Sequence, residues 1–277
     1  MERIITAINK IRTNSIKSAG EINLGMGLRK LEKEIKSMYQ KMQQDISHLK
    51  KLEQVRTEFL GNVSHELRTP IFAIQGFIET LLDGAIDDKK VNRSFLQKAN
   101  QHTLNLNSLL NDLIDISMIE SGQMIMSFRY FNAYEFLEAI VHELQPYAEM
   151  KNLSLNLSEL DKKLLLFGDK QRLKQVMTNL IMNAIKYTET GNIDVGIIEE
   201  VKTARIFVLD TGIGISDADK GRIFERFYRV DKDRSRSMGG TGLGLAIVKH
   251  IVEAHGSEVK LESRVGYGSQ FSFSLKK

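Results

Sequence analysis

The sequence predicts a multidomain protein: an all-α helical hairpin that pairs with a second copy into a dimeric four-helix bundle, followed by an α+β sandwich. Apolar residues recur at helical spacing through most of the chain before Gly122, a pattern that favours amphipathic helices. Beyond Gly122, short β-branched and apolar segments alternate with helical patterns, which is typical of a sheet with helices packed on it. The two parts of the chain are therefore expected to differ in fold class.

Composition restricts the classes of protein to which this chain can belong. With 277 residues, 42% of them hydrophobic and 27% charged, it suits one large or two ordinary soluble domains. Its formal net charge of +4 includes no dense basic cluster with interleaved aromatic residues, so we expect no nucleic-acid partner. The absence of cysteine excludes disulfides and thiolate metal sites and fits a cytoplasmic protein. No apolar run reaches the ~18 residues of a membrane span, so we expect the chain as given to be soluble.

The N-terminal region predicts two helices separated by a glycine-containing break. Apolar residues at helical spacing favour a helix over residues 3–19, and the segment 20–27 ends it. A second apolar stripe then advances mostly in three- and four-residue steps. It favours a parallel coiled coil between two chains, and the alternative is one edge of a monomeric bundle. The stripe consists of Leu28, Leu31, Ile35, Met38, Met42, Ile46, Leu49, Leu52, Val55 and Phe59.

Residues 51–122 predict a helical hairpin. The first helix continues past Pro70, which we expect to bend it, and over residues 71–82 to a polar break. A second helix is predicted from about 91 to 120, and Gly122 ends it because glycine suits a left-handed cap. Two antiparallel helices cannot enclose a core alone, so two copies of the chain are expected to form the four-helix bundle.

Residues 123–277 predict a mixed sheet that is covered by helices on one face. Apolar and β-branched runs indicate the strands, and amphipathic patterns indicate the helices. The long, charged segment 215–241 is expected to be a functional lid. The predicted strands are Ile125–Arg129, Leu153–Leu157, Leu164–Phe167, Ile193–Glu199, Arg205–Leu209, Glu258–Glu262 and Gln270–Leu275. The predicted helices are Ala133–Lys151, Lys170–Tyr187 and Leu243–His255.

A run of residues whose side chains are suited to catalysis lies late in the first long helix. It reads Ser64-His65-Glu66-Leu67-Arg68-Thr69-Pro70, so His65 is expected to project from a helix surface with Glu66 beside it. Thr69 falls one turn later and shares the face of His65. A neutral imidazole is an adequate nucleophile at pH 7, and a carboxylate on its other ring nitrogen favours the reactive tautomer. A single helical histidine is usually structural, so this interpretation depends on a partner site elsewhere in the chain.

Polar residues in the second half of the chain predict that partner site. Asn179 and Asn183 share a helix face, where neutral amides can bind Mg²⁺ without adding negative charge beside phosphates. Asp210 ends an apolar strand and opens a turn that contains Gly212 and Gly214. A carboxylate there can accept a hydrogen bond from an adenine amino group, and the glycines let the backbone pass close to the base. Each pattern alone also fits an ordinary helix face or turn.

A glycine-rich segment then leads into a helix. The run Gly240-Thr241-Gly242-Leu243-Gly244 precedes an apolar helical pattern, and such backbone at a helix N-terminus is suited to bind phosphate. It is not a Walker A loop, because no Gly-Lys-Ser/Thr follows, and no strand directly precedes it as in a dinucleotide-binding fold. A further glycine turn comes before the last predicted strand. The order of these elements along the chain is more specific than any one of them.

In this order the motifs resemble the sensor histidine kinases of two-component systems. The resemblance covers roughly residues 50–277 and includes the run Ile223-Phe224-Glu225-Arg226-Phe227-Tyr228-Arg229. It implies a dimerisation and histidine-phosphotransfer bundle followed by an ATP-binding domain of the Bergerat fold. It also implies ATP and Mg²⁺ as cofactors, with His65 as phosphoacceptor and Glu66 as its adjacent base. The implied assembly is a homodimer that passes phosphate to an aspartate on the receiver domain of a response regulator.

The same resemblance assigns the remaining site residues. Asn183 is the implied Mg²⁺ ligand with Asn179 beside it, and Asp210 is implied to read adenine. Arg229 is expected near the γ-phosphate. From its position one turn after His65, and not from the resemblance, the hydroxyl of Thr69 is expected to hold a water for a phosphatase activity toward the regulator; the alternative is that Thr69 only starts the bend at Pro70. The residues expected to face the phosphates or ribose, or to shape the pocket and lid, are Lys186, Tyr187, Gly212, Gly214, Gly240, Thr241, Gly242, Leu243 and Gly244.

The expected domains are signalling helices over 1–50, dimerisation and phosphotransfer over 51–122, and ATP binding over 123–277. The first is expected to be a plain signalling coiled coil. The alternative is a HAMP relay, which the helix–glycine break–helix order resembles although the connector is short; a HAMP relay would imply a natural parent with membrane spans upstream. Two other classes of protein share the nucleotide fold. The first is an ATPase of the gyrase, mismatch-repair or chaperone type, which has a water-activating glutamate where this chain has Asn179. The second is a non-catalytic scaffold, which does not need the intact motifs that this chain has.

Overall fold

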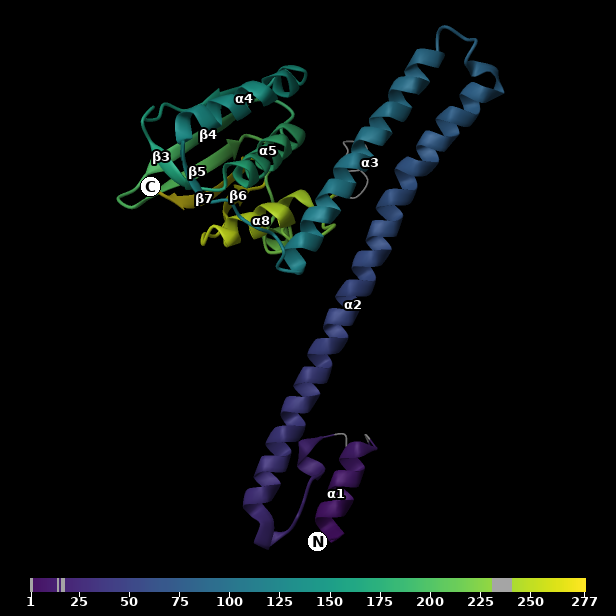
Figure 1. Cartoon of the computed structure of the whole chain (residues 1–277), viewed down its shortest axis with the longest axis vertical. Helices are drawn as coiled ribbons and strands as arrows, with labels where there is room; N and C mark the ends of the chain where they lie inside the picture. The colour runs from purple at the N-terminus through teal and green to yellow at the C-terminus, as the bar shows by residue number, and fades with distance from the viewer. Residues whose placement is uncertain (1, 14, 16–17, 231–240) are drawn as a thin grey trace. The chain divides into compact units, whose positions relative to one another are not determined.

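The computed structural model describes residues 2–13, 15, 18–230 and 241–277 (Figure 1). It divides into two compact units, Met1–Ser64 and His65–Lys277, which are described one at a time. Among the helices of the described ranges, none is both long enough and apolar enough to cross a lipid bilayer.

The N-terminal unit consists of a short helix, a connecting segment and the start of a very long helix. The short helix is α1 (Glu2–Arg12), and the connector contains the 3-10 turns η1 (Ala19–Glu21) and η2 (Met26–Leu28) before α2 (Arg29–Thr80) begins. Figure 1 shows α1 and the start of α2 running in the same direction, with the connector returning between them. A small core joins all three parts. Its buried members are Ala7, Ile22, Leu24 and Tyr39.

The first helix is shorter than predicted. The sequence pattern favoured a helix over 3–19, whereas α1 ends at Arg12. The hydroxyl of Thr13 donates to the carbonyl of Asn9 at 2.9 Å, so a side chain satisfies one of the last helical carbonyls as the helix ends. Residues 14, 16 and 17, which belong to the predicted helix, lie outside the described residues.

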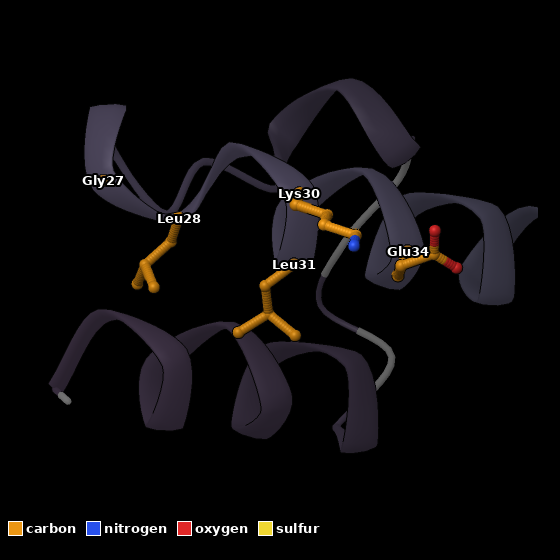
Figure 2. Close-up of a pocket in the computed structure, with 5 residues that line it drawn as sticks. All are labelled: Gly27, Leu28, Lys30, Leu31 and Glu34. Atoms are coloured by element: carbon orange, nitrogen blue, oxygen red, sulfur yellow. The ribbon is translucent and has the colours of Figure 1, made fainter.

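The apolar stripe of α2 is divided between two environments. Leu28, Ile35 and Met42 pack on the small core beside Tyr39, a residue that the predicted stripe omitted. Met38, which the stripe included, is 62% exposed. Figure 2 shows Leu28 and Leu31 projecting toward α1 in a groove whose lining is Gly27, Leu28, Lys30, Leu31 and Glu34. Part of the stripe therefore serves the fold of a single chain.

The predicted hairpin is confirmed in the second unit. Helix α2 stays helical through Pro70 to Thr80 and continues into the single π-helical turn η3 (Leu81–Ala85). Gly84 has φ +111° within that turn, a conformation that favours glycine. Helix α3 (Asn92–Glu120) then returns along α2. The ring of Phe77 on α2 lies 5.7 Å from that of Phe95 and 6.0 Å from that of His102, both on α3.

The predicted α+β sandwich is also confirmed. Its mixed sheet has the order β1-β3-β7-β5-β4-β2, with β6 paired to β7. Only the pair β2–β4 is parallel among the strand pairs of the described residues. The strands are β1 (Arg129–Asn132), β2 (Ser154–Leu157), β3 (Leu165–Gly168), β4 (Asn192–Glu199), β5 (Thr203–Asp210), β6 (Lys260–Arg264) and β7 (Gly268–Lys276).

Three helices cover one face of this sheet. Helix α5 (Lys170–Tyr187) packs between α4 (Ala133–Glu149) and α8 (Gly244–Ala254), and Figure 1 shows all three on the same side. Every second residue of β5 is buried under them, from Ala204 to Asp210. Because side chains alternate along a strand, the carboxylate of Asp210 points to the helix side like the apolar residues before it. The short helix α6 (Asp217–Lys220) follows in the predicted lid segment.

One strand prediction was wrong. The pattern placed a strand at Ile125–Arg129, whereas the first strand begins at Arg129 and residues 125–128 have no regular structure. The N–H of Ser127 donates to Oδ2 of Asp169 at 2.8 Å and not to a neighbouring strand. Ile125 is 90% exposed, so this apolar side chain is not part of the core.

Asp169 and His255 form a junction that holds α5 and α8 together. Oδ1 of Asp169 accepts the N–H groups of Gln171 and Arg172 at 3.0 and 3.1 Å and so caps α5. The N–H of Asp169 donates to Nε2 of His255 at 3.0 Å, while Nδ1 of the same ring lies 2.7 Å from the carbonyl of Ile251. This pattern requires the neutral ring with its proton on Nδ1. Burial accordingly lowers the pKa of His255.

This junction predicts an acid-sensitive fold. Because the pKa of His255 is lowered in the folded state, the unfolded chain binds the proton more tightly. The free energy of unfolding should therefore be highest above the ordinary histidine pKa of about 6.5 and fall as pH drops below it. Melting temperatures between pH 7.5 and 5.5 test this. His255→Gln should flatten the pH dependence, and His255→Ala should cost about 2 kcal/mol at pH 7.5 through two lost hydrogen bonds and lost packing. An equally steep profile in His255→Gln would contradict the assignment.

Candidate functional site

The structure brings together the motifs from three separate segments of the second half of the chain. The end of α5, the turn after β5 and the start of α8 are joined by direct contacts. The N–H of Ile213 donates to the carbonyl of Tyr187 at 3.2 Å. The side-chain amide of Asn179 lies 3.5 Å from the carbonyl of Gly244. The predicted pocket residues on these segments are therefore neighbours in the fold, although they are far apart in the sequence.

Asp210 lies at the base of this group with one oxygen already bonded. Its Oδ1 accepts the N–H groups of Gly212 at 2.8 Å and Ser269 at 3.2 Å. Its Oδ2 has no hydrogen-bond partner among the described residues, although the side chain is only 6% exposed. Burial raises the pKa of Asp210, and the two N–H groups oppose that shift. The arrangement leaves one carboxylate oxygen to accept a donor from a bound molecule.

Gly212 allows the polar groups beside it to approach closely. A Cβ built on Gly212 would lie 2.5 Å from the carbonyl oxygen of Tyr187, 2.8 Å from Oδ1 of Asp210 and 3.0 Å from Oγ1 of Thr188. Backbone carbonyl and carboxylate oxygens cannot yield to such a contact, so glycine is required here. Polar oxygens therefore lie close around this glycine.

Thr188 carries an unsatisfied hydroxyl beside Gly212. The residue is 0% exposed, and its Oγ1 is the buried side-chain atom without a hydrogen-bond partner in the described part of the chain. A buried hydroxyl that makes no hydrogen bond costs about 1–3 kcal/mol. The cost disappears if a water or a bound ligand reaches the hydroxyl, so Thr188 fits a ligand contact that no sequence motif indicated.

The two asparagines of α5 have different surroundings. The side chain of Asn179 contacts the first residue of α8, as described above, whereas the side chain of Asn183 makes no hydrogen bond to any described residue. Both are half-buried at the edge of a helix face whose other members are apolar and buried. The side-chain oxygen of Asn183 is therefore available to a hard cation such as Mg²⁺.

Two cations lie close together at the end of α5. Burial, and secondarily the nearby charge of Arg229, lower the pKa of Lys186 from 10.5 to about 8. Its Nζ also lies 5.2 Å from the ring centre of Tyr187. Two positive charges held near one another in a partly buried site are suited to bind an anion between them. Lys186, Tyr187 and Arg229 thus occupy places that suit the phosphate or ribose contacts predicted for them.

The described ends of the lid segment are tied to one another. The N–H of Phe227 donates to the carbonyl of Gly242 at 2.9 Å. Gly242 has φ +71°, and a Cβ there would lie 2.8 Å from Cα of Phe227, so only glycine fits this crossing. The hydroxyl of Thr241 accepts from the N–H of Leu243 at 3.2 Å just before α8 begins. Gly240, another predicted pocket residue, lies outside the described residues.

Gly214 supports the same pocket from the side of β6. It has φ +68°, and a Cβ there would lie 2.1 Å from the carbonyl oxygen of Arg264. The N–H of Gly266 donates to the carbonyl of Ile213 at 2.8 Å. The turn after β5 is therefore fastened to the β6–β7 turn, and this holds the backbone around Asp210 in place.

His65 lies on α2 with the neighbours that its sequence context predicted. Its side chain is exposed, and Thr69, one turn later, donates from Oγ1 to the carbonyl of His65 at 3.3 Å. Glu66 forms an ion pair with Arg229, in which Nη2 of the arginine lies 2.9 Å from Oε2 of the glutamate. The arginine side chain is only 9% exposed. One contact therefore links the residue next to the exposed histidine with the cationic end of the pocket.

Further polar contacts join α3 to the sandwich, and no sequence motif predicted them. Asp115 accepts from Arg172 at 2.7 Å and from Gln175 at 2.6 Å, both on α5. Asp112 accepts from Thr241 at 2.9 Å, and burial raises the pKa of this aspartate. Glu120 pairs with Arg226. The available signal was the presence of three acids, Asp112, Asp115 and Glu120, among the apolar positions of α3, but acids on a helix usually face solvent.

Two family profiles match the sequence over these regions. One is described as "His Kinase A (phospho-acceptor) domain" and matches residues 55–122. The other is described as "Histidine kinase-, DNA gyrase B-, and HSP90-like ATPase" and matches residues 168–277. The sensor histidine kinase WalK of Bacillus subtilis is 36% identical over 239 residues, which cover 83% of this chain.

The chain belongs to the sensor histidine kinases. Its sequence spans 38% of the length of WalK, so it corresponds to part of that relative. Among solved structures, histidine kinase ThkA in complex with response regulator protein TrrA has a TM-score of 0.62 at 26% identity, covering 92% of this chain and 68% of that chain. Full-length ShkA in complex with AMPPNP has a TM-score of 0.58 at 26% identity, covering 81% and 46%.

The unsatisfied hydroxyl of Thr188 in this histidine kinase predicts opposite effects of its removal on stability and on nucleotide affinity. Thr188→Val removes the hydroxyl at nearly constant volume, so thermal stability should stay equal or rise because no polar group is left unpaired. If a water on Thr188 contacts nucleotide, ATP affinity should fall by about 1 kcal/mol, or roughly fivefold. Calorimetric titration with ADP and a melting curve measure the two effects. Thr188→Ser keeps the hydroxyl and is the control. Equal ADP affinity in Thr188→Val and wild type would remove Thr188 from the ligand contacts.

Proposed function

We propose that this chain uses ATP to phosphorylate His65 and then passes the phosphoryl group to an aspartate of a response regulator. The Arg229–Glu66 ion pair carries the proposal, because it connects the cationic end of the pocket to the residue beside His65. The matching family profiles support it, since one describes a phospho-acceptor domain and the other an ATPase. ThkA was solved in complex with a response regulator protein, which favours the same class of partner here.

The proposed nucleotide site uses the geometry at the end of α5. Adenine donates its amino group to Oδ2 of Asp210, the carboxylate oxygen without a partner among the described residues. The side-chain oxygen of Asn183 holds Mg²⁺, which neutralises phosphate charge. Lys186 and Arg229 receive the phosphates, which relieves the mutual repulsion of the two cations. Neutral amides and cations suit a polyanionic ligand, and the one carboxylate, that of Asp210, lies at the adenine end, away from the phosphates.

The proposed transfer is a displacement at the γ-phosphorus. A neutral imidazole nitrogen of His65 forms the new N–P bond, and the bond from phosphorus to the β–γ bridging oxygen breaks, releasing ADP. The other ring nitrogen loses its proton, which the carboxylate of Glu66 is placed to accept. Such transfers depend mainly on alignment and charge neutralisation. The chain supplies both through α2, which presents His65, and through the cations at the end of α5.

In this proposal Arg229 changes partners during the cycle. While it is paired with Glu66, the guanidinium occupies the carboxylate. When a γ-phosphate takes the guanidinium, Glu66 is released next to His65. Both partners are guanidinium ligands of similar geometry, and a doubly charged phosphate competes well with a carboxylate. The exchange therefore couples nucleotide binding to activation of the histidine.

The exposed apolar residues of the hairpin support a homodimer. Helices α2 and α3 pack on one another but leave a large apolar surface that one chain cannot cover. A second copy that packs its own hairpin against this surface completes a four-helix bundle. The exposed apolar residues of the hairpin include Ile71, Phe72, Ile78, Leu82, Leu96, Leu104, Leu110, Ile114 and Met118.

The N-terminal unit is proposed to relay a signal to the kinase. Its two helices run in the same direction, and Ile22 and Leu24 of the connector are buried between them. This arrangement favours the HAMP-like interpretation over a plain coiled coil, because a plain coiled coil buries no connector. The exposed apolar positions further along α2, such as Leu49, Leu52 and Val55, fit a seam with the second copy. Rotation of that seam is a direct route to the helix that bears His65.

Two other classes of activity are distinguished by one experiment with γ-labelled ATP. A histidine kinase yields protein-bound label that is labile to acid and stable to base. An ATP-driven conformational machine yields free phosphate only, and a scaffold yields neither. Asn179 occupies the position at which such machines carry a water-activating glutamate, which favours the kinase outcome.

Substitution of the phosphoacceptor should separate binding from transfer. His65→Gln should abolish protein labelling while ADP affinity stays within about twofold of wild type, because the side chain is exposed on α2. Asp210→Asn should instead weaken ADP binding, since it replaces an acceptor oxygen at the base of the pocket. Labelling assays and calorimetry on both variants give the comparison. Stable labelling of His65→Gln would show that the phosphoacceptor is elsewhere.

Nucleotide affinity should depend on pH through Lys186. Its pKa of about 8 in the free protein should rise when phosphates bind, because they favour the charged ammonium. Affinity for ATP is then fully present below pH 8 and lost above it, by at most roughly tenfold per pH unit. Titrations from pH 7 to 9.5 measure the slope. Lys186→Met should bind weakly with a flat profile, and a slope equal to that of wild type would place the phosphates elsewhere.

A phosphatase activity toward the regulator is proposed for Thr69. Its exposed hydroxyl lies one turn from His65 and is suited to orient a water toward a docked phosphoaspartate. Thr69→Ala should keep most labelling of His65, whereas the half-life of regulator phosphate should lengthen at least severalfold, since orienting a catalytic water is worth roughly ten- to a thousandfold. The two measurements are compared at matched melting temperature. An unchanged half-life would assign Thr69 to helix structure alone.

A further inference from the structure

A lysine outside every predicted motif binds the end of α5. Lys151 follows α4, and its Nζ donates to the carbonyl oxygens of Ile185 at 2.8 Å, Lys186 at 2.9 Å and Thr188 at 3.4 Å. The last carbonyls of a helix have no partner within it and carry a partial negative charge. One ammonium group with three donors can satisfy several of them. Lys151 therefore acts as a cationic cap for the last turn of α5.

The remaining carbonyl of that turn is bound from the opposite segment. The carbonyl oxygen of Tyr187 accepts the N–H of Ile213 at 3.2 Å, and Gly212 packs against the same oxygen. The turn that presents Lys186 and Tyr187 is thus fixed on one side by Lys151 and on the other by the turn after β5. Each side uses different carbonyls, so neither can replace the other.

The backbone around Lys151 is itself fixed. Its N–H donates to the carbonyl of Ala148 at 3.0 Å, and Asn152 adopts φ +57°. The N–H of Leu153 also donates to the carbonyl of Ala148, and that of Ser154 donates to the carbonyl of Gly191, just before β4. The ammonium therefore projects from a rigid helix end and not from a mobile loop. Such a base allows a long side chain to act as a spacer between α4 and α5.

We infer that Lys151 is a positioning residue for nucleotide, which acts by holding the last turn of α5 so that Lys186 and Tyr187 face the phosphates. The inference rests on the proposed nucleotide site. Lys151 itself points to the carbonyls, so its effect on ligand passes through the backbone of that turn. Without the ammonium, the carbonyls need water or a shift of the turn, and the phosphate-facing side chains lose their fixed placement.

The test compares Lys151→Met with Lys151→Arg and Lys151→Gln in the full chain, using ADP as the probe. Lys151→Met should bind ADP about tenfold more weakly and raise KM for ATP by a similar factor, because hydrogen bonds from a charged group are lost. The kcat should fall much less, since His65 and the transferring groups are unchanged. Lys151→Arg, which keeps a cationic donor, should restore most of the affinity, and Lys151→Gln should be intermediate.

Two controls make the outcome specific. Lys174→Met removes a surface lysine that pairs with Glu143 on the same domain and should leave ADP affinity unchanged. Ile140→Val lowers stability in the buried face of α4 away from the turn. If Ile140→Val at matched melting temperature weakens ADP as much as Lys151→Met, or if Lys151→Arg gives no rescue, the role of Lys151 is purely structural and the inference is wrong.

The same titrations separate this inference from the proposed site. Normal ADP affinity in Lys151→Met, with weak binding in Asp210→Asn, overturns the positioning role and leaves the site intact. Normal affinity in both variants overturns the site. If Lys151→Met does not fold, Lys151→Gln and Lys151→Arg decide the question: equal affinity in these two variants and wild type contradicts the inference, and a graded loss supports it.

Discussion

The buried carboxylate of Asp210 is the constraint around which the second half of this histidine kinase is arranged. One of its oxygens accepts two N–H groups, from the turn that follows β5 and from the start of β7. The N–H bonds compensate a desolvated acid that would otherwise be costly to bury. They also fix the backbone of two loops relative to the sheet. Because Gly212 and Ile213 then contact the carbonyl of Tyr187, the placement of α5 relative to the pocket depends on the same carboxylate.

The second organising feature is a division of charge between the helical hairpin and the sandwich. Acids on α2 and α3, among them Glu66 and Asp115, contact arginines of the sandwich. Ion pairs that remain partly exposed contribute little net stability, since hydration and side-chain entropy offset their attraction. Contacts of this kind specify an arrangement without making it permanent. They suit the proposed transfer, in which a nucleotide reaches His65 and then leaves it.

Local patterns predicted most of the elements well. The bounds of α5 were predicted residue for residue, because an N-cap aspartate begins the helix and its apolar face is continuous. The strand at 125–129 was wrong because apolar character alone does not show whether a strand neighbour exists. The stripe of α2 was only partly correct, since Tyr39 and not Met38 faces the small N-terminal core. A single sequence shows the period of a stripe but not the direction of its partner.

The sequence by itself determined the fold classes of the two parts, the family, and the identity of the candidate groups. It did so because periodicity and motif order are local properties of the chain. Only the tertiary structure revealed the contacts of Lys151, Thr188 and Asp112, and the pairing of Arg229 with Glu66. These residues are ordinary in their local context. Their importance comes from groups that lie far along the chain, and such proximity exists only after the chain has folded.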